Sequence, residues 1–484
     1  MSLKSRFGWN TLVSFFSVSG VQIVKFLTSI AFVNIAGSSA VGVYFVFMSV
    51  YRLLNRATTF GLGQAIVKRV SERESTTEAN IASIVATGFV LRAIPILLIS
   101  TVLAVLSSRV NSYVGLDSAW VFVVVALWGT MLYSTYRSTL YGQRRIDIAS
   151  GFDLFKDIGT AVIQVALVVV GYAQWGLVVG FITGLLVSAI SIFSFTRVPI
   201  HTVSFNYEQA KSLFSFAKFS YLDNLVGGEH RWLDIIILGF FVSSDQIGVY
   251  GIVYGLVQFG LISSNVLARN IFPEVSNLTS NDSTKTSEKL LYRALSYSTL
   301  FILPILVGSF VIADRLLIDI YDLDTGAAPL LVLAAGTIAY CVYNQLHQLI
   351  YGLGKPKYAF LLSSLSTVIN AVIAILLIPF VGILGAAIST SLSMLAALIG
   401  GLYVITVHSD ITVRFPLRPW GFQVVCAIVM GAVVFVIRSQ AVYQTRFYSA
   451  GLVLLGGVVY LSLVILTDSF LRTQLRRVLT RIGT

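Results

Sequence analysis

The sequence predicts an all-α integral membrane protein of about 14 transmembrane helices: two six-helix lobes, as parallel repeats around a central cavity, plus two extra C-terminal helices. The composition is the first reason, because 56% of the 484 residues are hydrophobic and 11% are charged, whereas soluble domains average about 25% charged residues. The second is that apolar runs reach the length of about 20 residues that crosses a bilayer. The third is that the first six predicted spans resemble the next six.

Each span is placed on one apolar run. The first run follows the sequence MSLKSR and is longer than the hydrophobic region of a signal peptide, about 7–15 residues, so we expect a retained span. Pro95 and Pro304 lie inside spans, which bundled membrane helices tolerate. The predicted spans are 9–35, 40–63, 80–107, 119–140, 153–171, 176–196, 218–241, 246–270, 290–313, 328–350, 358–379, 383–406, 420–438 and 446–467.

The loops between the spans alternate in charge. One set, which includes Lys4, Arg6 and the C-terminal tail, carries 19 Lys and Arg residues, and the other set carries four. Because basic loops stay in the cytoplasm, we expect a multi-pass protein of the cell (plasma) membrane with both termini cytoplasmic. Topology thereby accounts for the net charge of +12, and no nucleic-acid partner is predicted.

Three pairs of similar segments indicate an internal repeat. Gly-Val-Tyr occurs at 42–44 and 248–250, Tyr-Gly at 141–142 and 351–352, and QWGLVVGFITGLL from 174 resembles ILGAAISTSLSML from 383. The common offset of 206–210 residues predicts that spans 1–6 are duplicated as spans 7–12. Parallel repeats suit a transporter with its site between the halves. The predicted parts are an N-terminal lobe 1–196, a cytoplasmic linker 197–217, a C-terminal lobe 218–406, spans 13 and 14 over 420–467, and a basic tail 468–484.

Basic side chains inside the spans are the main functional signal. Each costs about 2.5–3.5 kcal/mol at mid-membrane, so they should face a bundle interior or a hydrated cavity. In the first lobe no acid lies at comparable depth. Arginine suits phosphate oxygens, so we expect an anionic headgroup to bind; the alternative is pairing with acids of the seventh span. The predicted headgroup contacts are Lys25, Arg52, Arg56, Arg92 and Arg231.

The seventh span contains GEHRWLD, with four ionisable side chains in seven residues. We assign coupling or gating to Asp223, Glu229, His230 and Asp234. For the aspartates, proton or cation coupling and interhelical salt bridges both stay open. For the histidine, titration near neutral pH and a packing role both stay open.

Neutral polar residues recur at helical spacing in other spans. In the first span they accompany Lys25, in the second Arg52, and in the tenth they form a polar and aromatic stripe that continues to Tyr351. Such stripes indicate a wet cavity rather than a lipid-facing surface. The predicted cavity-lining residues are Gln22, Asn55, Tyr340, Asn344, His347 and Gln348.

Motifs for catalysis and metal binding are absent from the sequence. GxxxxGK[ST], HExxH, CxxC and GxSxG do not occur, and Cys341 and Cys426 lie in apolar runs as packing residues. The loops expected outside are short. We therefore predict a non-enzyme with no catalytic residues, no metal site and no cofactor, apart from a coupling H⁺ or Na⁺.

The chain resembles the polysaccharide-transporter branch of the multidrug/oligosaccharidyl-lipid/polysaccharide exporter superfamily, the Wzx-type flippases. The span count, the repeat, the Gly-Val-Tyr and Tyr-Gly motifs and the segment LLNRATTFGLGQAIVKRVSE carry the resemblance. In that segment Gly61 and Gly63 precede Lys68 and Arg69, as a glycine pair precedes basic residues in the family.

The resemblance implies translocation of a polyprenyl-phosphate- or pyrophosphate-linked oligosaccharide to the outer leaflet by alternating access. It places sugar-phosphate contacts on Lys25, Arg52, Arg56 and Arg231. The implied partners are the lipid-linked glycan, the bilayer and enzymes of glycan assembly. Three alternatives stay open: a peptidoglycan-precursor flippase, a cation-coupled multidrug exporter and a membrane glycan polymerase.

Overall fold

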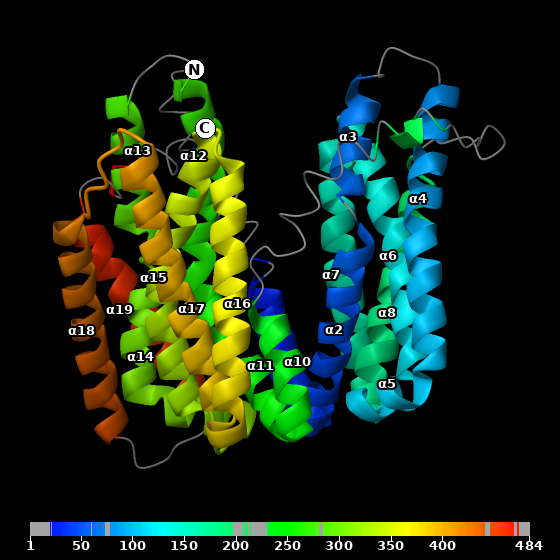
Figure 1. The fold of residues 1–484 in the computed structure, drawn as a ribbon. Helices are drawn as coiled ribbons and strands as arrows, with labels where there is room; N and C mark the ends of the chain where they lie inside the picture. The colour runs from blue at the N-terminus through cyan, green and yellow to red at the C-terminus, as the bar shows by residue number, and fades with distance from the viewer. Residues whose placement is uncertain are drawn as a thin grey trace, which may run out of the picture. The chain divides into compact units, whose positions relative to one another are not determined.

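All regular secondary structure in the described part of the chain is helical (Figure 1). A computed structural model gives the structure. It describes residues 20, 22–59, 61–72, 78–196, 207, 209–211, 213, 230–279, 284–440, 446–468 and 472–473.

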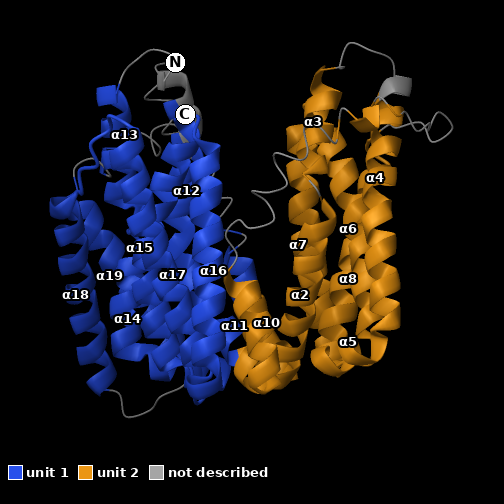
Figure 2. Cartoon of the chain, in the orientation of Figure 1, with its two compact units in different colours: residues 1–26, 249–484 blue, residues 27–248 orange. Residues whose placement is uncertain are grey.

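The chain forms two compact units (Figure 2). We call residues 27–248 the N-unit, and residues 1–26 with 249–484 the C-unit. The N-unit contains α2 (Ser38–Thr59), α3 (Leu62–Glu72), α4 (Glu78–Val105), α5 (Ser107–Val114), α6 (Ala119–Gly142), α7 (Ile146–Val169), α8 (Ala173–Phe193) and α10 (His230–Phe241). The boundary falls within α11 (Ser244–Gln258). The predicted lobes were defined by a sequence repeat, whereas the two units are defined by contacts in the structure. The duplication and the lobe limits therefore stay predictions.

The C-unit continues from α11 through a 3₁₀ turn, Phe259–Leu261, and it contains a π-helical segment, Leu316–Ile320, directly after α14. Its other helices are α12 (Ile262–Thr279), α13 (Thr284–Ser298), α14 (Ile302–Arg315), α15 (Ala327–Gly352), α16 (Pro356–Val381), α17 (Ile383–His408), α18 (Leu417–Gln440) and α19 (Arg446–Thr467).

Ten helical segments among the described residues are long and apolar enough to cross a membrane, and a shorter apolar helix covers Gln22–Ala36. They coincide with ten of the fourteen predicted spans. The second and fifth predicted spans correspond to α2 and α7, whose charged residues interrupt their apolar runs. The first and seventh lie only partly within the described residues. The count of fourteen therefore stays a prediction.

Two boundaries differ from the sequence prediction. Residues 108–114, expected to be in a loop, belong to the short helix α5, which ends where Gly115 adopts a left-handed conformation (φ 75°) and donates its N–H to Asn111 O at 2.9 Å. Such a left-handed glycine is a common helix terminator. α7 begins at Ile146 rather than at 153, so Asp147 and Asp153 are helical.

Ridges of small residues let neighbouring helices pack closely in both units. In the N-unit, Gly176, Gly180 and Gly184 of α8 face α7, and a Cβ on Gly180 would lie 2.8 Å from Gln164 Cα. In the C-unit, Gly385 of α17 approaches α16 in the same way: a Cβ there would lie 2.8 Å from the carbonyl carbon of Leu377. Small residues at i, i+4 and i+8 are typical of close membrane helix packing, because lipid offers no hydrophobic force to join helices.

α2 and the first turn of α11 touch through glycine. A Cβ on Gly42 would collide with the carbonyl group of Ser244, and a Cβ on Gly248 would collide with that of Ser38. Ser38 Oγ also donates a hydrogen bond to Asp245 Oδ1. The contact is reciprocal, because Ser38 and Ser244, like Gly42 and Gly248, are 206 residues apart. The two Gly-Val-Tyr motifs thus meet.

One face of α16 is an exposed apolar stripe, whose members recur every three or four residues and are each about half exposed. Such a stripe suits contact with hydrocarbon, where burial within the protein is unnecessary. Its members are Leu361, Leu365, Val368, Val372 and Ile375.

Candidate anion-binding site

Arginine side chains from three helices gather in the N-unit. α2 supplies Arg52 and Arg56, α4 supplies Arg92, and α10 supplies Arg231. α2 packs against α4, α6 and α10. Helical geometry accounts for the arrangement on α2, because Arg52, Asn55, Arg56 and Thr59 are three or four residues apart and share one face.

Two of these guanidinium groups lie against one indole ring. Arg52 Cζ is 4.6 Å from the centroid of Trp232, and Arg231 Cζ is 5.0 Å from the same ring. Arg231 Cζ also lies 4.7 Å from the ring centroid of Phe45. A cation–π contact orients a guanidinium group and contributes about 0.5–2 kcal/mol, but it does not neutralise the charge. The ring thus brings together two guanidinium groups, whose forked donors suit phosphate oxygens.

Arg92 is almost wholly buried, with 4% of its surface exposed. Its Nη2 donates to Asn55 Oδ1 at 2.8 Å and to Thr59 Oγ1 at 3.4 Å, and its Nη1 donates to Ser134 Oγ. All three partners are neutral. The hydrogen bonds fix the Asn55 amide on the face of α2 that carries Arg52. The assignment of Arg92 as a headgroup contact stays a prediction. The burial of Arg92 indicates that it positions Asn55.

α10 buries the other ionisable groups of GEHRWLD that the structure describes. His230 is 7% exposed and Asp234 is 0% exposed, and they lie one helical turn apart. Asp223 and Glu229 lie outside the described residues. The coupling or gating role of all four residues stays a prediction.

Gln22 and Lys25 lie on the helix Gln22–Ala36, in the part that belongs to the C-unit. The side chain of Lys25 is exposed and that of Gln22 is partly buried. Arg56 lies on α2 and is partly buried. The structure thus groups Arg52, Asn55, Arg92 and Arg231 within the N-unit. The headgroup role of all five predicted contacts stays a prediction.

The polar stripe of α15 belongs to the C-unit, and hydrogen bonds to neighbouring helices take up much of it. Asn344 Nδ2 donates to Asn265 Oδ1 at 3.1 Å and to Ser264 Oγ at 3.2 Å. His347 Nε2 lies 3.2 Å from Ser363 Oγ. Tyr340 packs against Tyr343 with ring centroids 6.2 Å apart, and Gln348 is partly buried. These contacts join α15 to α12 and α16; the cavity-lining role of the stripe stays a prediction.

One charged network, between α6 and α7, was not predicted from the sequence. Asp153 of α7 accepts hydrogen bonds from Arg137 Nη2 at 2.6 Å and from Tyr133 Oη at 2.8 Å, both on α6. Arg137 Cζ lies 4.8 Å from the ring of Tyr141. The residues 210 positions further along the chain lie on α15 and α16 and contact one another in the same pattern. The offset of the repeat is therefore the sequence signal that could have predicted the network on α6 and α7.

The aromatic partners Phe45 and Trp232 also escaped the sequence analysis. Trp232 directly follows Arg231 in GEHRWLD. Neighbouring side chains on a helix point in different directions, so sequence proximity alone did not predict that two arginines lie against the Trp232 ring.

Comparison with known proteins identifies the family. The family model of polysaccharide biosynthesis proteins matches residues 36–321. The probable low-salt glycan biosynthesis flippase Agl15 of Haloferax volcanii is 24% identical over 458 residues, which cover 94% of this chain and 95% of that protein. The probable flippase AglR of the same organism is 28% identical over 345 residues, covering 70% and 72% of the two chains.

The fold also has a solved counterpart. A structure of the lipid II flippase MurJ in an inward closed conformation superposes with a TM-score of 0.74 at 15% identity, covering 94% of this chain and 98% of that one. With the apolar helices, this likeness confirms the predicted all-α membrane fold. The family model and the relatives confirm the resemblance inferred from the motifs. The chain belongs to the polysaccharide biosynthesis protein family, as a Wzx-type multi-pass membrane transporter.

Proposed function

We propose that this protein translocates a polyprenyl-phosphate- or pyrophosphate-linked oligosaccharide from the cytoplasmic to the outer leaflet of the plasma membrane by alternating access. The glycan would serve cell-surface polysaccharide or glycoprotein assembly, with glycan-assembly enzymes as partners. The family and the flippase names of the two relatives support the transport of a lipid-linked glycan. The distribution of basic loops supports cytoplasmic termini.

The observation that carries the proposal is the pair of guanidinium groups on Trp232. Arg52 comes from α2 and Arg231 from α10, and the shared ring holds them near each other. A phosphate or pyrophosphate would accept hydrogen bonds from both, in the forked geometry that arginine offers. Asn55, oriented by Arg92, adds a neutral donor beside them.

The headgroup-binding step predicts a large loss on removing both charges. Each charge-assisted hydrogen bond contributes about 1.5–3 kcal/mol, and about 1.4 kcal/mol corresponds to a factor of ten. We expect the double variant R52Q/R231Q to slow translocation by about 100-fold or more. The measurement is the exposure of radiolabelled polyprenyl-linked glycan to an impermeant glycosidase on proteoliposomes that contain the full chain.

Arg418 offers a matched control. Its Cζ lies 5.8 Å from the ring of Phe422, so it is another arginine on an aromatic face, and it belongs to the C-unit rather than to the N-unit that contains the arginine cluster. R418Q should translocate at the wild-type rate. Wild-type translocation by R52Q/R231Q, at equal amounts of inserted protein, would contradict the proposal.

We also propose that an H⁺ or Na⁺ gradient drives the cycle, with Asp234 as the coupling group. A fully buried carboxyl group in an apolar helix is a common place for proton or cation coupling in transporters. D234N should lose the difference in translocation rate between vesicles with and without each gradient. An unchanged gradient dependence would remove the coupling role and leave the headgroup site untouched.

A further inference from the structure

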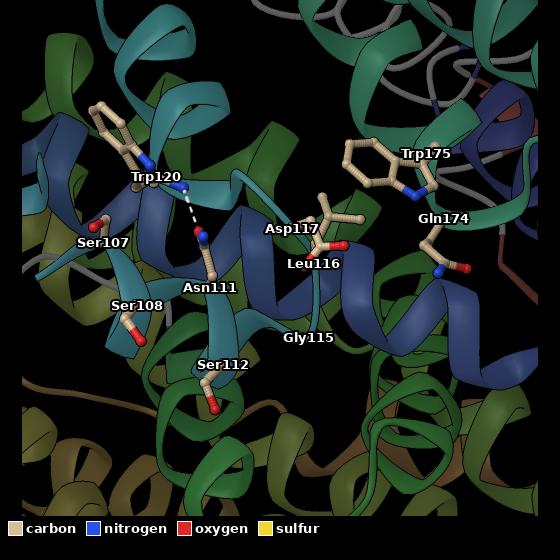
Figure 3. A pocket seen from close by; sticks show the side chains of 10 residues that line it. All are labelled: Ser107, Ser108, Asn111, Ser112, Gly115, Leu116, Asp117, Trp120, Gln174 and Trp175. Atoms are coloured by element: carbon tan, nitrogen blue, oxygen red, sulfur yellow. Dashed lines mark hydrogen bonds between the residues drawn. The ribbon is translucent and has the colours of Figure 1, made fainter.

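A groove at one end of the N-unit has a different chemistry from the arginine cluster (Figure 3). Its volume is about 670 Å³, and it lies where α5, the turn 115–118, the start of α6 and the start of α8 come together. Six of its ten lining residues carry polar side chains. The full lining is Ser107, Ser108, Asn111, Ser112, Gly115, Leu116, Asp117, Trp120, Gln174 and Trp175.

The aromatic parts of the groove are held in place. The Trp175 ring packs edge-on against Phe122, with ring centroids 5.6 Å apart and an interplanar angle of 74°. The backbone N–H of Trp120 donates to Asn111 Oδ1 at 3.3 Å, which ties α6 to α5. Figure 3 shows the two indole rings at opposite sides of the groove, with Asp117 between them.

The turns that border the groove have conformations that few residues adopt. Gly115 and Ser118 have φ angles of 75° and 59°, and Gly171 and Ala173 have φ angles of 101° and 40°. A residue other than glycine with positive φ costs of order 1–3 kcal/mol and persists only where the surroundings fix it. Ser118 and Ala173 therefore indicate that both turns have a defined shape.

The composition of the lining selects a neutral, hydroxyl-rich ligand. A carboxylate, two amides and three serine hydroxyls offer both donors and acceptors, as a sugar requires. Trp120 and Trp175 add flat apolar faces, on which the C–H side of a sugar ring packs. Asp117 would repel a phosphate, and the lining contains no Lys or Arg. The groove thus suits a saccharide, whereas the arginine cluster suits a phosphate.

The groove lies beside the start of α2, since a Cβ on Gly115 would lie 3.6 Å from Val43 Cγ2. Arg52 is nine residues further along that helix, which corresponds to roughly 14 Å. α5 also touches α10, because Tyr113 Oη donates to Ile236 O at 2.6 Å. Burial raises the pKa of the Tyr113 hydroxyl, so the hydroxyl stays a donor. The groove is therefore within reach of a glycan whose phosphate is at the cluster.

From these observations we infer that the groove binds neutral sugar units of the transported glycan, on the side where α2 begins. The inference rests on the proposed function, because the glycan is then part of the substrate. In the predicted orientation this is the outer side, so the groove would hold the saccharide after it crosses. Its specificity for the glycan would be separate from the phosphate recognition of the arginine cluster.

Binding of a lipid-free glycan tests the groove apart from the cluster. The ligand is oligosaccharide that mild acid releases from the polyprenyl-linked pool of the host, titrated against the full chain in nanodiscs. W120A and W175A should each weaken this binding by about tenfold. R52Q/R231Q should bind the same oligosaccharide as the wild type does. W175F, which keeps a flat ring, should retain most of the affinity.

Tyr172 supplies the matched control, because it is an exposed aromatic residue three positions before Trp175 and does not line the groove. Interfacial aromatic residues also anchor membrane proteins, and anchoring would make Y172A and W175A equivalent. Y172A should leave binding unchanged. Equal weakening by Y172A, no weakening by W120A and W175A, or no binding of lipid-free oligosaccharide by the wild type would each overturn the inference.

The two proposals fail in different ways. If wild-type proteoliposomes do not translocate the lipid-linked glycan, the proposed function is wrong whatever the groove binds. If they do translocate it, and W120A and W175A bind lipid-free oligosaccharide as the wild type does, the groove assignment alone is wrong.

Discussion

The α6–α7 pair of the N-unit and the α15–α16 pair of the C-unit carry the same contact network in two chemical forms. In the first, Asp153 accepts hydrogen bonds from Tyr133 and Arg137. In the second, Ser363 occupies the place of Asp153 and lies 3.4 Å from Tyr343 Oη and 3.2 Å from His347 Nε2. The matched positions are 210 residues apart throughout: 133 and 343, 137 and 347, 153 and 363.

A fourth position completes the correspondence. Tyr141 lies beneath Arg137, with 4.8 Å between Cζ and the ring centroid, and Tyr351 lies 5.1 Å from His347, ring to ring. The geometry is therefore kept while the charge differs. An ion pair joins α6 to α7, whereas a neutral hydrogen bond joins α15 to α16 at the matched positions.

The difference also teaches how to interpret a polar stripe in a membrane helix. His347 was predicted to line a cavity, yet the equivalent Arg137 is bound to a carboxylate of the next helix. Hydrogen bonds between helices involve much of this stripe, whereas Arg52 and Arg231 both lie against the ring of Trp232. A polar stripe can therefore serve helix packing, and polarity alone does not identify an anion site.

The largest loss of stability should come from breaking the ion pair between Arg137 and Asp153. D153A leaves the Arg137 guanidinium group in an apolar helix pair without its carboxylate. Loss of one partner costs about 3–5 kcal/mol for a buried pair and under about 1 kcal/mol for an exposed pair. Arg137 and Asp153 are 37% and 31% exposed, so we expect about 2 kcal/mol, measured as a lower Tm in detergent. A loss no greater than that of S363A would erase the distinction between the two forms.

Converting the charged form into the neutral one sharpens the comparison. In R137H/D153S, histidine and serine stand where the C-unit has His347 and Ser363, and no buried charge lacks a partner. We expect the double variant to lose about 1 kcal/mol, less than D153A alone, because removing both charges avoids the uncompensated ion. The same thermal unfolding experiment checks this, with R137H alone as the control. A double variant that is less stable than D153A would mean that the two networks are not interchangeable.

The smallest loss of stability should come from removing the neutral hydrogen bonds of Ser363. S363A removes the hydroxyl group that Tyr343 and His347 share, at 3.4 and 3.2 Å. Bonds of this length are weak, so we expect about 0.5 kcal/mol, the low end of the usual contribution of a hydrogen bond. S364A, one residue further along α16, is the natural control for the substitution itself. A loss of several degrees in Tm for S363A but not for S364A would mean that the neutral form is as strong as the charged one.

Hydropathy was sufficient to predict the membrane fold, because the free energy of transfer into lipid depends on composition over about 20 residues. α6 and α15 end at Gly142 and Gly352, two residues beyond the predicted span ends at 140 and 350. By contrast, α5 is short, and the residues before Gly115 gave no apolar periodicity to predict it. Arg52 and Arg231 could be singled out from the sequence, since charge in an apolar run is visible there, while their headgroup role stays a prediction.

What surrounds those arginines was not predictable from sequence. The ring of Trp232 serves two guanidinium groups because α2 and α10 pack together, a contact between segments about 180 residues apart. The partners of Arg92 were not predicted either: it is buried and donates hydrogen bonds to Asn55 of α2 and to Ser134 of α6. The groove was not predicted either, since its lining comes from three helices whose polar residues are individually ordinary.

The reciprocal contact of Gly42 and Gly248 has a bearing on the origin of the chain. Each glycine presses on the serine four positions before the other, which is the pattern of an isologous interface, where one surface patch meets its own copy. A half-length ancestor that paired as a two-fold homodimer would have made this contact twice with a single glycine. If the repeat arose by duplication, as the sequence predicts, the fused chain needs two glycine codons for this contact, and substitution of either glycine alone would push α2 and the first turn of α11 apart.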